Sequence, residues 1–187
     1  MSTIPDTEED RPSSVAGSSE KPEAGFTLNA EVAEFAPTFV PNFAAPSFQG
    51  LYTSAHAYTH ALEMAKDQFG CRLLQQVLED NAAVQPIFSQ VIAGFPDLMV
   101  DAFGNYLCQK LVELLSEEQL QAVLDVVLPS VFHVSVNIHG TRAVQKLVEV
   151  CAVHPAMTSQ LQTHLAPCIT SLVRDPNGNH VVSYLLI

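Results

Sequence analysis

The chain has 187 residues, 48% of them hydrophobic and 15% charged, which suits one ordinary domain and a tail. No run of about 18 apolar residues is evident, so we expect no membrane-spanning helix and no membrane partner. The net charge of −12 argues against a strongly basic protein that holds nucleic acid by its phosphates.

The N-terminus and the cysteines indicate the cellular compartment. The polar, acidic start of the chain lacks the basic residues and apolar core of a secretory signal. The cysteines form no C-x-x-C pair and show no metal-ligand spacing, so we expect reduced thiols, no metal and no cofactor in a cytosolic or nuclear protein. These cysteines are Cys71, Cys108, Cys151 and Cys168.

Residues 1–50 form an acidic segment rich in proline and serine, which we expect to be a disordered tail. Within residues 35–48, phenylalanines recur near helical spacing, but prolines interrupt any helix. This Phe-rich stretch is either a linker that contacts the first repeat or a short docking peptide for another protein. The phenylalanines are Phe35, Phe39, Phe43 and Phe48.

Residues 51–187 contain a short phrase that occurs four times, each time around a glycine. The glycines lie 34, 36 and 38 residues apart, a period typical of stacked helical units that cannot bury their apolar faces alone. The residue three positions before each glycine suits a helix N-cap or turn, and the glycine permits a tight turn or a close approach of backbone. The glycines are Gly70, Gly104, Gly140 and Gly178, preceded by Asp67, Asp101, Asn137 and Asp175.

Each repeat is predicted to contain three helices and no strand, which makes the domain all-α. A short first helix leads to the glycine, a presenting helix follows the glycine, and an outer helix leads to the next repeat. Ser116 and Gln119 form a capping-box pattern at the start of one outer helix. Pro86 and Pro155 suit the first position of two other outer helices.

The presenting helix has a polar and an apolar side. At about 100° per residue, Arg72 and Gln75 lie within about 100° of Cys71, and the leucines and valines lie opposite. The position of Arg72 holds a planar side chain in every copy, and planar groups stack on nucleic-acid bases. The amide of Gln75 can both donate to and accept from a base edge. The planar residues are Arg72, Tyr106, Arg142 and His180.

These residues make the chain resemble the Pumilio-type (PUF) RNA-binding repeats over about residues 55–187, with the fourth repeat incomplete. The resemblance implies a right-handed, armadillo-like α-solenoid of about 36-residue repeats with three helices each. It also implies that these are the first four repeats of a longer array. We therefore expect a fragment or a truncated gene product.

In such repeats, the residue after the glycine and the residue four positions later contact the base edge, and the residue between them stacks on the base. The resemblance assigns stacking to Arg72, Tyr106, Arg142 and His180. The first and third repeats then resemble adenine readers and the second a uracil reader; Asn179 suits uracil, but Ser183 replaces the expected glutamine. The base-edge residues are Cys71, Gln75, Asn105, Gln109, Thr141, Gln145, Asn179 and Ser183.

Because PUF repeats bind RNA antiparallel, the implied target is single-stranded 5′-U-A-U-A-3′. The resemblance implies binding to 3′ untranslated regions of messenger RNA in the cytoplasm and repression through translational-repression or deadenylation proteins. We expect a monomer that catalyses no reaction. The alternative is a helical-repeat scaffold for protein interactions with little RNA affinity, which the low basic content and Ser183 favour.

Positive charge is scarce after residue 50, and it is concentrated on the repeated segments. This predicts binding dominated by base contacts rather than by phosphate attraction. Lys110 and Lys146 either approach phosphates or stay solvated. The bases are Lys66, Arg72, Lys110, Arg142, Lys146 and Arg174.

A few single residues allow other interpretations. Cys71 at a helix start beside Arg72 could be an activated thiolate, although no acid or base is placed to serve it. His56 and His60 could share a metal ion, but an exposed face of a first helix explains them better. Cys108 is expected in the core.

Overall fold

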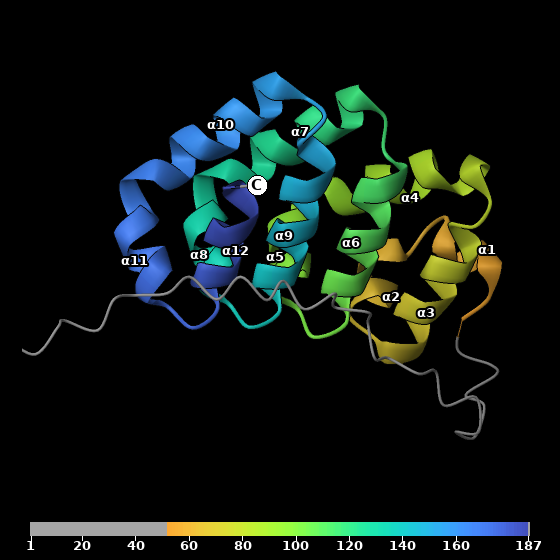
Figure 1. Ribbon diagram of the computed structural model, residues 1–187. Coiled ribbons are helices and arrows are strands. Elements are labelled where there is room, and N and C mark those ends of the chain that lie inside the picture. The colour runs from red at the N-terminus through yellow and green to blue at the C-terminus, as the bar shows by residue number, and fades with distance from the viewer. Residues whose placement is uncertain (1–51, 187) are drawn as a thin grey trace, which may run out of the picture. The chain divides into compact units, whose positions relative to one another are not determined.

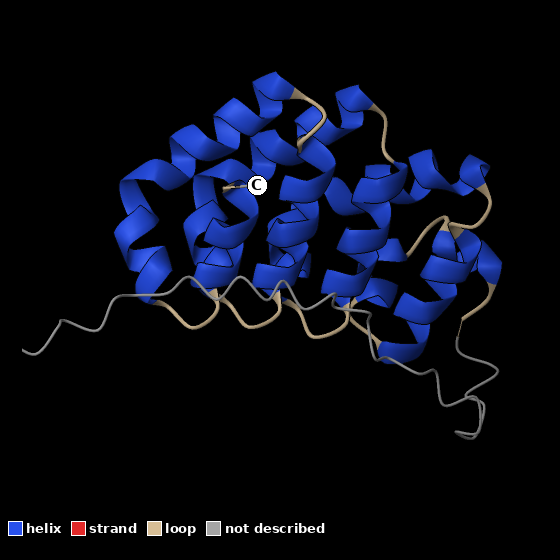
Figure 2. Ribbon diagram, in the orientation of Figure 1, coloured by secondary structure: helices blue, strands red, loops and turns tan. Residues whose placement is uncertain are grey.

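Helices form all of the regular secondary structure of residues 52–186, which are the residues that this computed structural model describes (Figure 2). These residues lie in the unit Val40–Ile187. The predicted tail, including the Phe-rich stretch, lies outside the described residues. Its boundary near residue 50 stays a prediction.

The first three repeats contain the three predicted helices, and the described part of the fourth contains a first and a presenting helix (Figure 1). The first helices are α2 (Ala61–Ala65), α5 (Phe95–Val100), α8 (Val131–Val136) and α11 (Ile169–Arg174). The presenting helices are α3 (Gln68–Val77), α6 (Gly104–Leu114), α9 (Gly140–Cys151) and α12 (Gly178–Leu185). The outer helices are α4 (Val84–Val91), α7 (Glu117–Val127) and α10 (Pro155–Leu165), and a further helix, α1 (Ser54–Ala57), precedes the first repeat.

Short 3-10 turns bend the chain where an outer helix meets the first helix of the next repeat. These turns are η2 (Ile92–Gly94), η3 (Leu128–Ser130) and η4 (Ala166–Cys168), while η1 (Asn81–Ala83) leads into α4. Each outer helix and the following first helix therefore form one bent rod that carries the chain from one repeat to the next.

The repeats stack so that helices of one kind lie beside their counterparts (Figure 1). The presenting helices follow one another in the order α3, α6, α9 and α12, and each packs against the first helix of its own repeat. Each unit therefore buries its apolar side against its own helices and against the neighbouring repeat. The predicted all-α, right-handed solenoid is confirmed.

The turn before each presenting helix has the same chemistry in all four repeats. Oδ1 of Asp67 accepts hydrogen bonds from the backbone N–H groups of Phe69 and Gly70, at 3.0 and 2.8 Å. A Cβ atom on Gly70 would lie 2.5 Å from the backbone oxygen of Met64, so only glycine lets the first helix come this close. Both predictions for this turn, the cap and the close approach, are confirmed in each copy.

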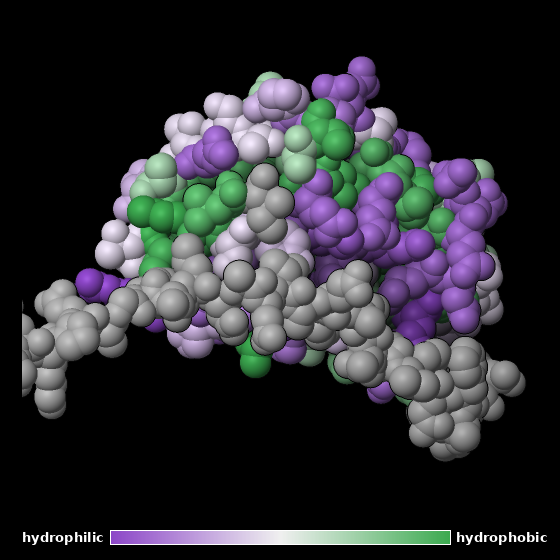
Figure 3. Space-filling view, viewed as in Figure 1, coloured by the Kyte–Doolittle hydropathy of each residue, from purple (hydrophilic) through white to green (hydrophobic). Residues whose placement is uncertain are grey.

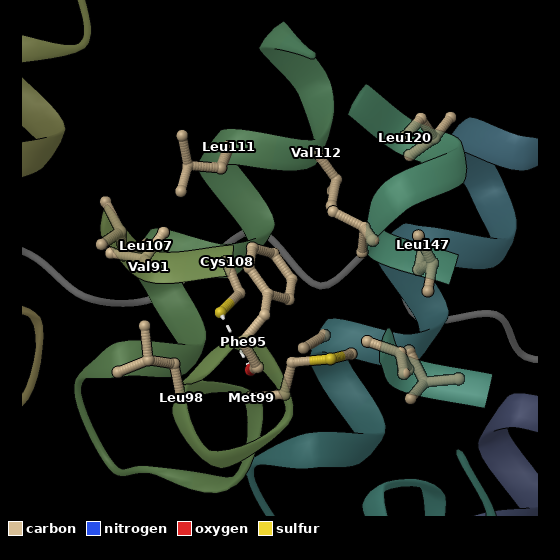
Figure 4. Close-up of a cluster of buried hydrophobic side chains, with 14 of the residues drawn as sticks. Val91, Phe95, Leu98, Met99, Leu107, Cys108, Leu111, Val112, Leu120 and Leu147 are labelled. Carbon is tan, nitrogen blue, oxygen red and sulfur yellow. Dashed lines mark hydrogen bonds between the residues drawn. The ribbon is translucent and has the colours of Figure 1, made fainter. Parts of the chain in front are cut away.

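The core joins neighbouring repeats rather than filling one repeat at a time. Figure 4 shows Phe95 and Met99 of α5 beside Cys108 of α6, with Leu147 of α9 approaching from the next repeat. These side chains are at most 1% exposed, and burial of each large apolar side chain contributes about 1.5–3 kcal/mol. The predicted core position of Cys108 is confirmed, and its thiol donates to the backbone oxygen of Phe95 at 3.9 Å.

The outer helices begin nearly as their sequences predict. The capping box of Ser116 and Gln119 is present, with Oε1 of Gln119 accepting from the Ser116 N–H at 2.9 Å. Pro155 is the first residue of α10, as predicted. The prediction for Pro86 is wrong, because it is the third residue of α4. Asp80 caps the turn η1 through the Ala82 N–H, so the helical segment starts earlier.

Two segments are long and apolar enough to cross a membrane by length and composition, contrary to the sequence-based expectation. They are residues 81–100 and 117–136, each an outer helix and the following first helix. Both are bent by a 3-10 turn, and apolar residues such as Ile87 and Val127 lie in the core. Packing within the stack accounts for this composition, so length and hydropathy are weak evidence for a membrane span here.

Candidate nucleic-acid interface

The planar side chains occupy one register of four neighbouring helices. Arg72, Tyr106, Arg142 and His180 each lie two residues after the repeat glycine, in α3, α6, α9 and α12. Because these helices stack in order, the planar groups succeed one another from repeat to repeat. The first three are half-buried, and His180 is exposed. The sequence-based row of flat groups is therefore present, while their contact with bases stays a prediction.

In the first two repeats, the predicted base-edge residues contact each other. Nε2 of Gln75 donates to Sγ of Cys71 at 3.3 Å, and Nε2 of Gln109 donates to Oδ1 of Asn105 at 3.0 Å. Both glutamines are half-buried. Each amide is thus oriented by its partner one helical turn earlier, which turns its oxygen away from that partner.

The third and fourth repeats orient these residues differently. Oε1 of Gln145 accepts from Nη1 of Arg142 at 3.3 Å, and Gln145 is only 7% exposed. The hydroxyl of Ser183 donates to the backbone oxygen of Asn179 at 3.1 Å, so it bonds back to its own helix. Ser183 therefore lacks both the length and the amide donor that a glutamine side chain provides at this position in the other repeats.

The residues directly after the glycines lie deeper than the sequence suggested. Cys71, Asn105 and Thr141 are each 2% exposed, whereas Asn179 in the fourth repeat is half-buried. Nδ2 of Asn105 donates to the backbone oxygen of Asp101 at 2.8 Å, within its own turn. These side chains lie below the surface that the presenting helices form, which we call the presenting face. Little of their area is accessible to a base.

The Cys71 thiol does not have the surroundings of an activated nucleophile. Burial raises the pKa of Cys71 to about 11, and this outweighs the hydrogen bond from Gln75, which lowers it. The charges of Asp101 and Asp67 raise it further. The thiol is therefore protonated near neutral pH, and the thiolate interpretation is not supported.

Lys146 is held by carboxylates instead of standing as a solvated cation. Its Nζ lies 3.1 Å from Oε1 of Glu113 on α6 and 3.0 Å from Oε2 of Glu149 on its own helix. Burial lowers the pKa of Lys146, but hydrogen bonds to Glu149 and Glu113 offset this and the net pKa is raised. Lys146 therefore joins the second and third repeats. Lys110, in the second repeat, is half-buried.

The histidine pair at the start of the stack serves local structure. Nδ1 of His56 accepts from the Thr53 N–H at 2.9 Å, and its ring centroid lies 5.9 Å from that of His60. His60 is exposed, but His56 is half-buried in α1, so the predicted exposed face of a first helix is only partly correct. Residues 52–186 contain no group of three side chains arranged to bind a metal ion.

The exposed side chains change from polar to apolar along the stack. Figure 3 shows polar side chains over the α3 and α6 region and apolar side chains toward the α11 and α12 end. At that end Ile169 is 38% exposed and Leu186 is 69% exposed. The presenting face is therefore mainly polar at the first two repeats.

Comparison with known proteins assigns this arrangement to a family. The family described as NOP9-like PUF repeat domain matches residues 49–186. The chain belongs to the PUF repeat family. This PUF chain is 40% identical over 130 residues to a Pumilio domain-containing protein of Schizosaccharomyces pombe, covering 68% of the chain and 19% of that relative. It is 43% identical over 128 residues to putative pumilio homolog 8, chloroplastic, of Arabidopsis thaliana, covering 66% and 25%.

A solved PUF structure is also similar. The Puf4 RNA-binding domain, bound to the HO endonuclease RNA 3′ UTR recognition sequence, superposes with a TM-score of 0.64 at 39% identity. The alignment covers 66% of this chain and 39% of the Puf4 chain. This PUF chain therefore spans less than half the length of the relatives described here.

Sequence reasoning missed how residues of the PUF phrase join one repeat to the next. Sγ of Cys71 donates to the backbone oxygen of Phe103 at 3.1 Å. Oγ1 of Thr141 donates to that of Asn177 at 2.9 Å. The donor and acceptor lie 32 and 36 residues apart, so no local pattern could reveal the bond. Only the repeat period indicated that positions about one repeat apart would lie close together.

Proposed function

We propose that this chain binds single-stranded RNA with sequence selectivity. The observation that carries the proposal is the row of planar side chains at one register of four stacked helices. Three members of the row have a glutamine one helical turn further on. Flat groups at regular steps can hold unpaired bases, and each base stacked on such a group contributes about 1–3 kcal/mol. The Puf4 structure, bound to RNA, supports the proposal.

The presenting face would read one base per repeat. Gln75 and Gln109 direct their amide nitrogens to Cys71 and Asn105, so their oxygens can accept from a base, and rotation of the amide exchanges the two roles. With the antiparallel orientation of PUF repeats, the target is 5′-U-A-U-A-3′. Burial of the residues after the glycines leaves stacking and the glutamines as the main contacts in the first two repeats. In the third repeat Gln145 is buried as well, so stacking on Arg142 would be the main contact.

We also propose that the ligand is messenger RNA and that the chain catalyses no reaction. The RNA in the Puf4 complex is a 3′ UTR recognition sequence, which favours the same class of target for this chain. The protein would then act in the cytoplasm as a monomer, repress translation or promote decay, and recruit translational-repression or deadenylation proteins to the bound transcript.

Binding of short RNAs tests the proposal. Fluorescence anisotropy would compare a labelled RNA that contains U-A-U-A with a scrambled RNA of the same composition, at fixed salt. Gln109→Glu removes the amide donor, so we expect affinity for U-A-U-A to fall about tenfold. Gln162→Glu makes the same charge change on the exposed side of α10 and should leave affinity unchanged.

A protein-interaction scaffold is the second candidate. It is favoured by the 2% exposure of Cys71, Asn105 and Thr141, and by the ion pairs that hold Lys146. Equal binding of the U-A-U-A and scrambled RNAs, or no binding of either, would support the scaffold and overturn RNA reading.

A further inference from the structure

The third repeat holds the turn between α11 and α12 of the fourth repeat at two points, both on Asn177. Oγ1 of Thr141, in the first turn of α9, donates to the backbone oxygen of Asn177 at 2.9 Å. Nδ2 of Asn177 donates to the backbone oxygen of Val136, at the end of α8, at 3.0 Å. Thr141 is only 2% exposed, so water competes little for its hydroxyl. We name Thr141, Asn177 and Val136 the Asn177 clamp.

The clamp uses groups that need partners. Val136 is the last residue of α8, and the last carbonyls of a helix have no donor within the helix. The Asn177 amide supplies such a donor from the neighbouring repeat. The Asn177 N–H in turn donates to Oδ1 of Asp175 at 2.8 Å, which fixes the turn itself. The start of α12 is therefore tied to both α8 and α9.

The other junctions between repeats have different chemistry. Between the first and second repeats, the bond to Phe103 comes from the Cys71 thiol, a weak donor, and Phe103 has no side-chain donor to return. Between the second and third repeats, Asn105 donates within its own turn. Among residues 52–186, a turn held by two neutral hydrogen bonds from the preceding repeat occurs only in the fourth repeat.

We propose that Thr141 and Asn177 are positioning residues that fix the spacing between the third and fourth stacking residues. This inference rests on the proposed function. Arg142 directly follows Thr141, and His180 lies three residues after Asn177, so the clamp joins the two turns that carry these planar groups. A fixed spacing holds two bases well only when they are adjacent in the RNA. An extra nucleotide at this step is then disfavoured.

A purely structural clamp predicts a different result. If the clamp only stabilised the fold, its loss would weaken every RNA by the same factor. If it sets spacing, its loss changes the preference between RNAs that differ in spacing at one step. The ratio of two affinities therefore separates the two roles.

The test uses three labelled RNAs and matched variants. The first RNA contains U-A-U-A, the second carries an extra cytidine after the first U, and the third carries it after the second U. The antiparallel orientation places the second RNA's insertion at the clamped step and the third RNA's insertion between the first and second repeats. The variants are Thr141→Val, Thr141→Ser, Asn177→Ala and, as a control, Thr158→Val.

The variants are chosen to isolate the hydrogen bonds. Thr141→Val keeps the size of the side chain and removes the donor, and Thr141→Ser restores the donor. Asn177 is not one of the predicted base-contact residues. Asn177→Ala therefore tests the spacing between bases without removing a contact to a base. Oγ1 of Thr158 donates to the backbone oxygen of Cys151 at 2.8 Å within the third repeat, so Thr158→Val removes a comparable bond away from the turn.

We expect the wild type to prefer the first RNA over both others. Since the loss of one neutral hydrogen bond changes an equilibrium about fivefold to tenfold, Thr141→Val and Asn177→Ala should reduce the preference over the second RNA by about that factor. The preference over the third RNA should not change. Thr141→Ser should restore the preference over the second RNA whatever its overall affinity, and Thr158→Val should behave as the wild type. Equal weakening of all three RNAs overturns the proposal.

Hydrogen exchange without RNA tests the clamp independently. Amides of α12 should exchange about fivefold faster in Thr141→Val than in Thr158→Val, with α6 unchanged. Equal exchange in α12 overturns the clamp itself. If the wild type binds none of the three RNAs, the proposed function fails and the spacing role fails with it. If the wild type binds U-A-U-A selectively and the spacing preference never changes, only this inference fails.

Discussion

At the scale of single residues, the fourth repeat departs from the others because Ser183 stands where they have glutamine. The Ser183 hydroxyl donates to the Asn179 backbone oxygen, as serine within a helix commonly does with a carbonyl one turn earlier. It is too short to reach as far as Gln75 or Gln109. His180 is exposed and remains available for stacking. The first base of the target would then be held by stacking more than by its edge.

Ser183→Gln should restore the missing contact. An amide at this position could donate to and accept from the first base, so affinity for U-A-U-A should rise about threefold to tenfold. The gain should vanish when the first U is replaced by another base, which anisotropy with the two RNAs would measure. Ser159→Gln adds the same side chain on the exposed side of α10 and serves as the control. An equal gain with both RNAs would contradict the prediction.

The sequence predicted the residues of the row but not their depth. Arg72 and Gln75 were placed on one face by helical periodicity alone, because residues within one helix are fixed relative to each other. The exposure of Cys71 depends on where α6 packs, and that depends on contacts between repeats. Those partners of Asn177 and Lys146 that lie in a neighbouring repeat were missed for the same reason.

At the scale of helices, the repeat glycines decide how closely two helices of one repeat approach. A Cβ atom on Gly140 would overlap the backbone oxygen of Val134 in α8, and a backbone group cannot move aside cheaply. A Cβ atom on Gly94 would meet Cδ1 of Leu62 at 3.1 Å, the end of a flexible side chain. The helix pattern, the caps and the repeat period all followed from the sequence because they depend on local chemistry.

Gly140→Ala should therefore destabilise the stack, although alanine is the better helix former. We expect overpacking to cost about 1–3 kcal/mol, which exceeds the gain of about 1 kcal/mol in helix propensity. Gly94→Ala should change the free energy of unfolding by less than about 1 kcal/mol. Urea unfolding followed by circular dichroism measures both. A variant of Gly140 as stable as the wild type would show that α8 and α9 can separate without loss.

At the scale of the whole molecule, an acidic protein with few free cations is proposed to bind a polyanion. The net charge is −12, and Lys146 is held between Glu113 and Glu149. Phosphate attraction can therefore contribute little to affinity, and stacking and base edges must supply most of it. Such binding is selective but weakly dependent on salt, the reverse of a basic protein that binds any strand.

The salt dependence of binding tests this balance directly. For single strands, the logarithm of the affinity falls with the logarithm of salt by about 0.7 for each phosphate neutralised. Neutralisation of about two phosphates by the few cations of the repeats then predicts a slope between about −1 and −2. Lys146→Met should leave the slope unchanged, because the ion pairs already occupy this lysine. A slope steeper than about −4 would mean that phosphates, not bases, hold the RNA. The row of planar residues would then be incidental to binding.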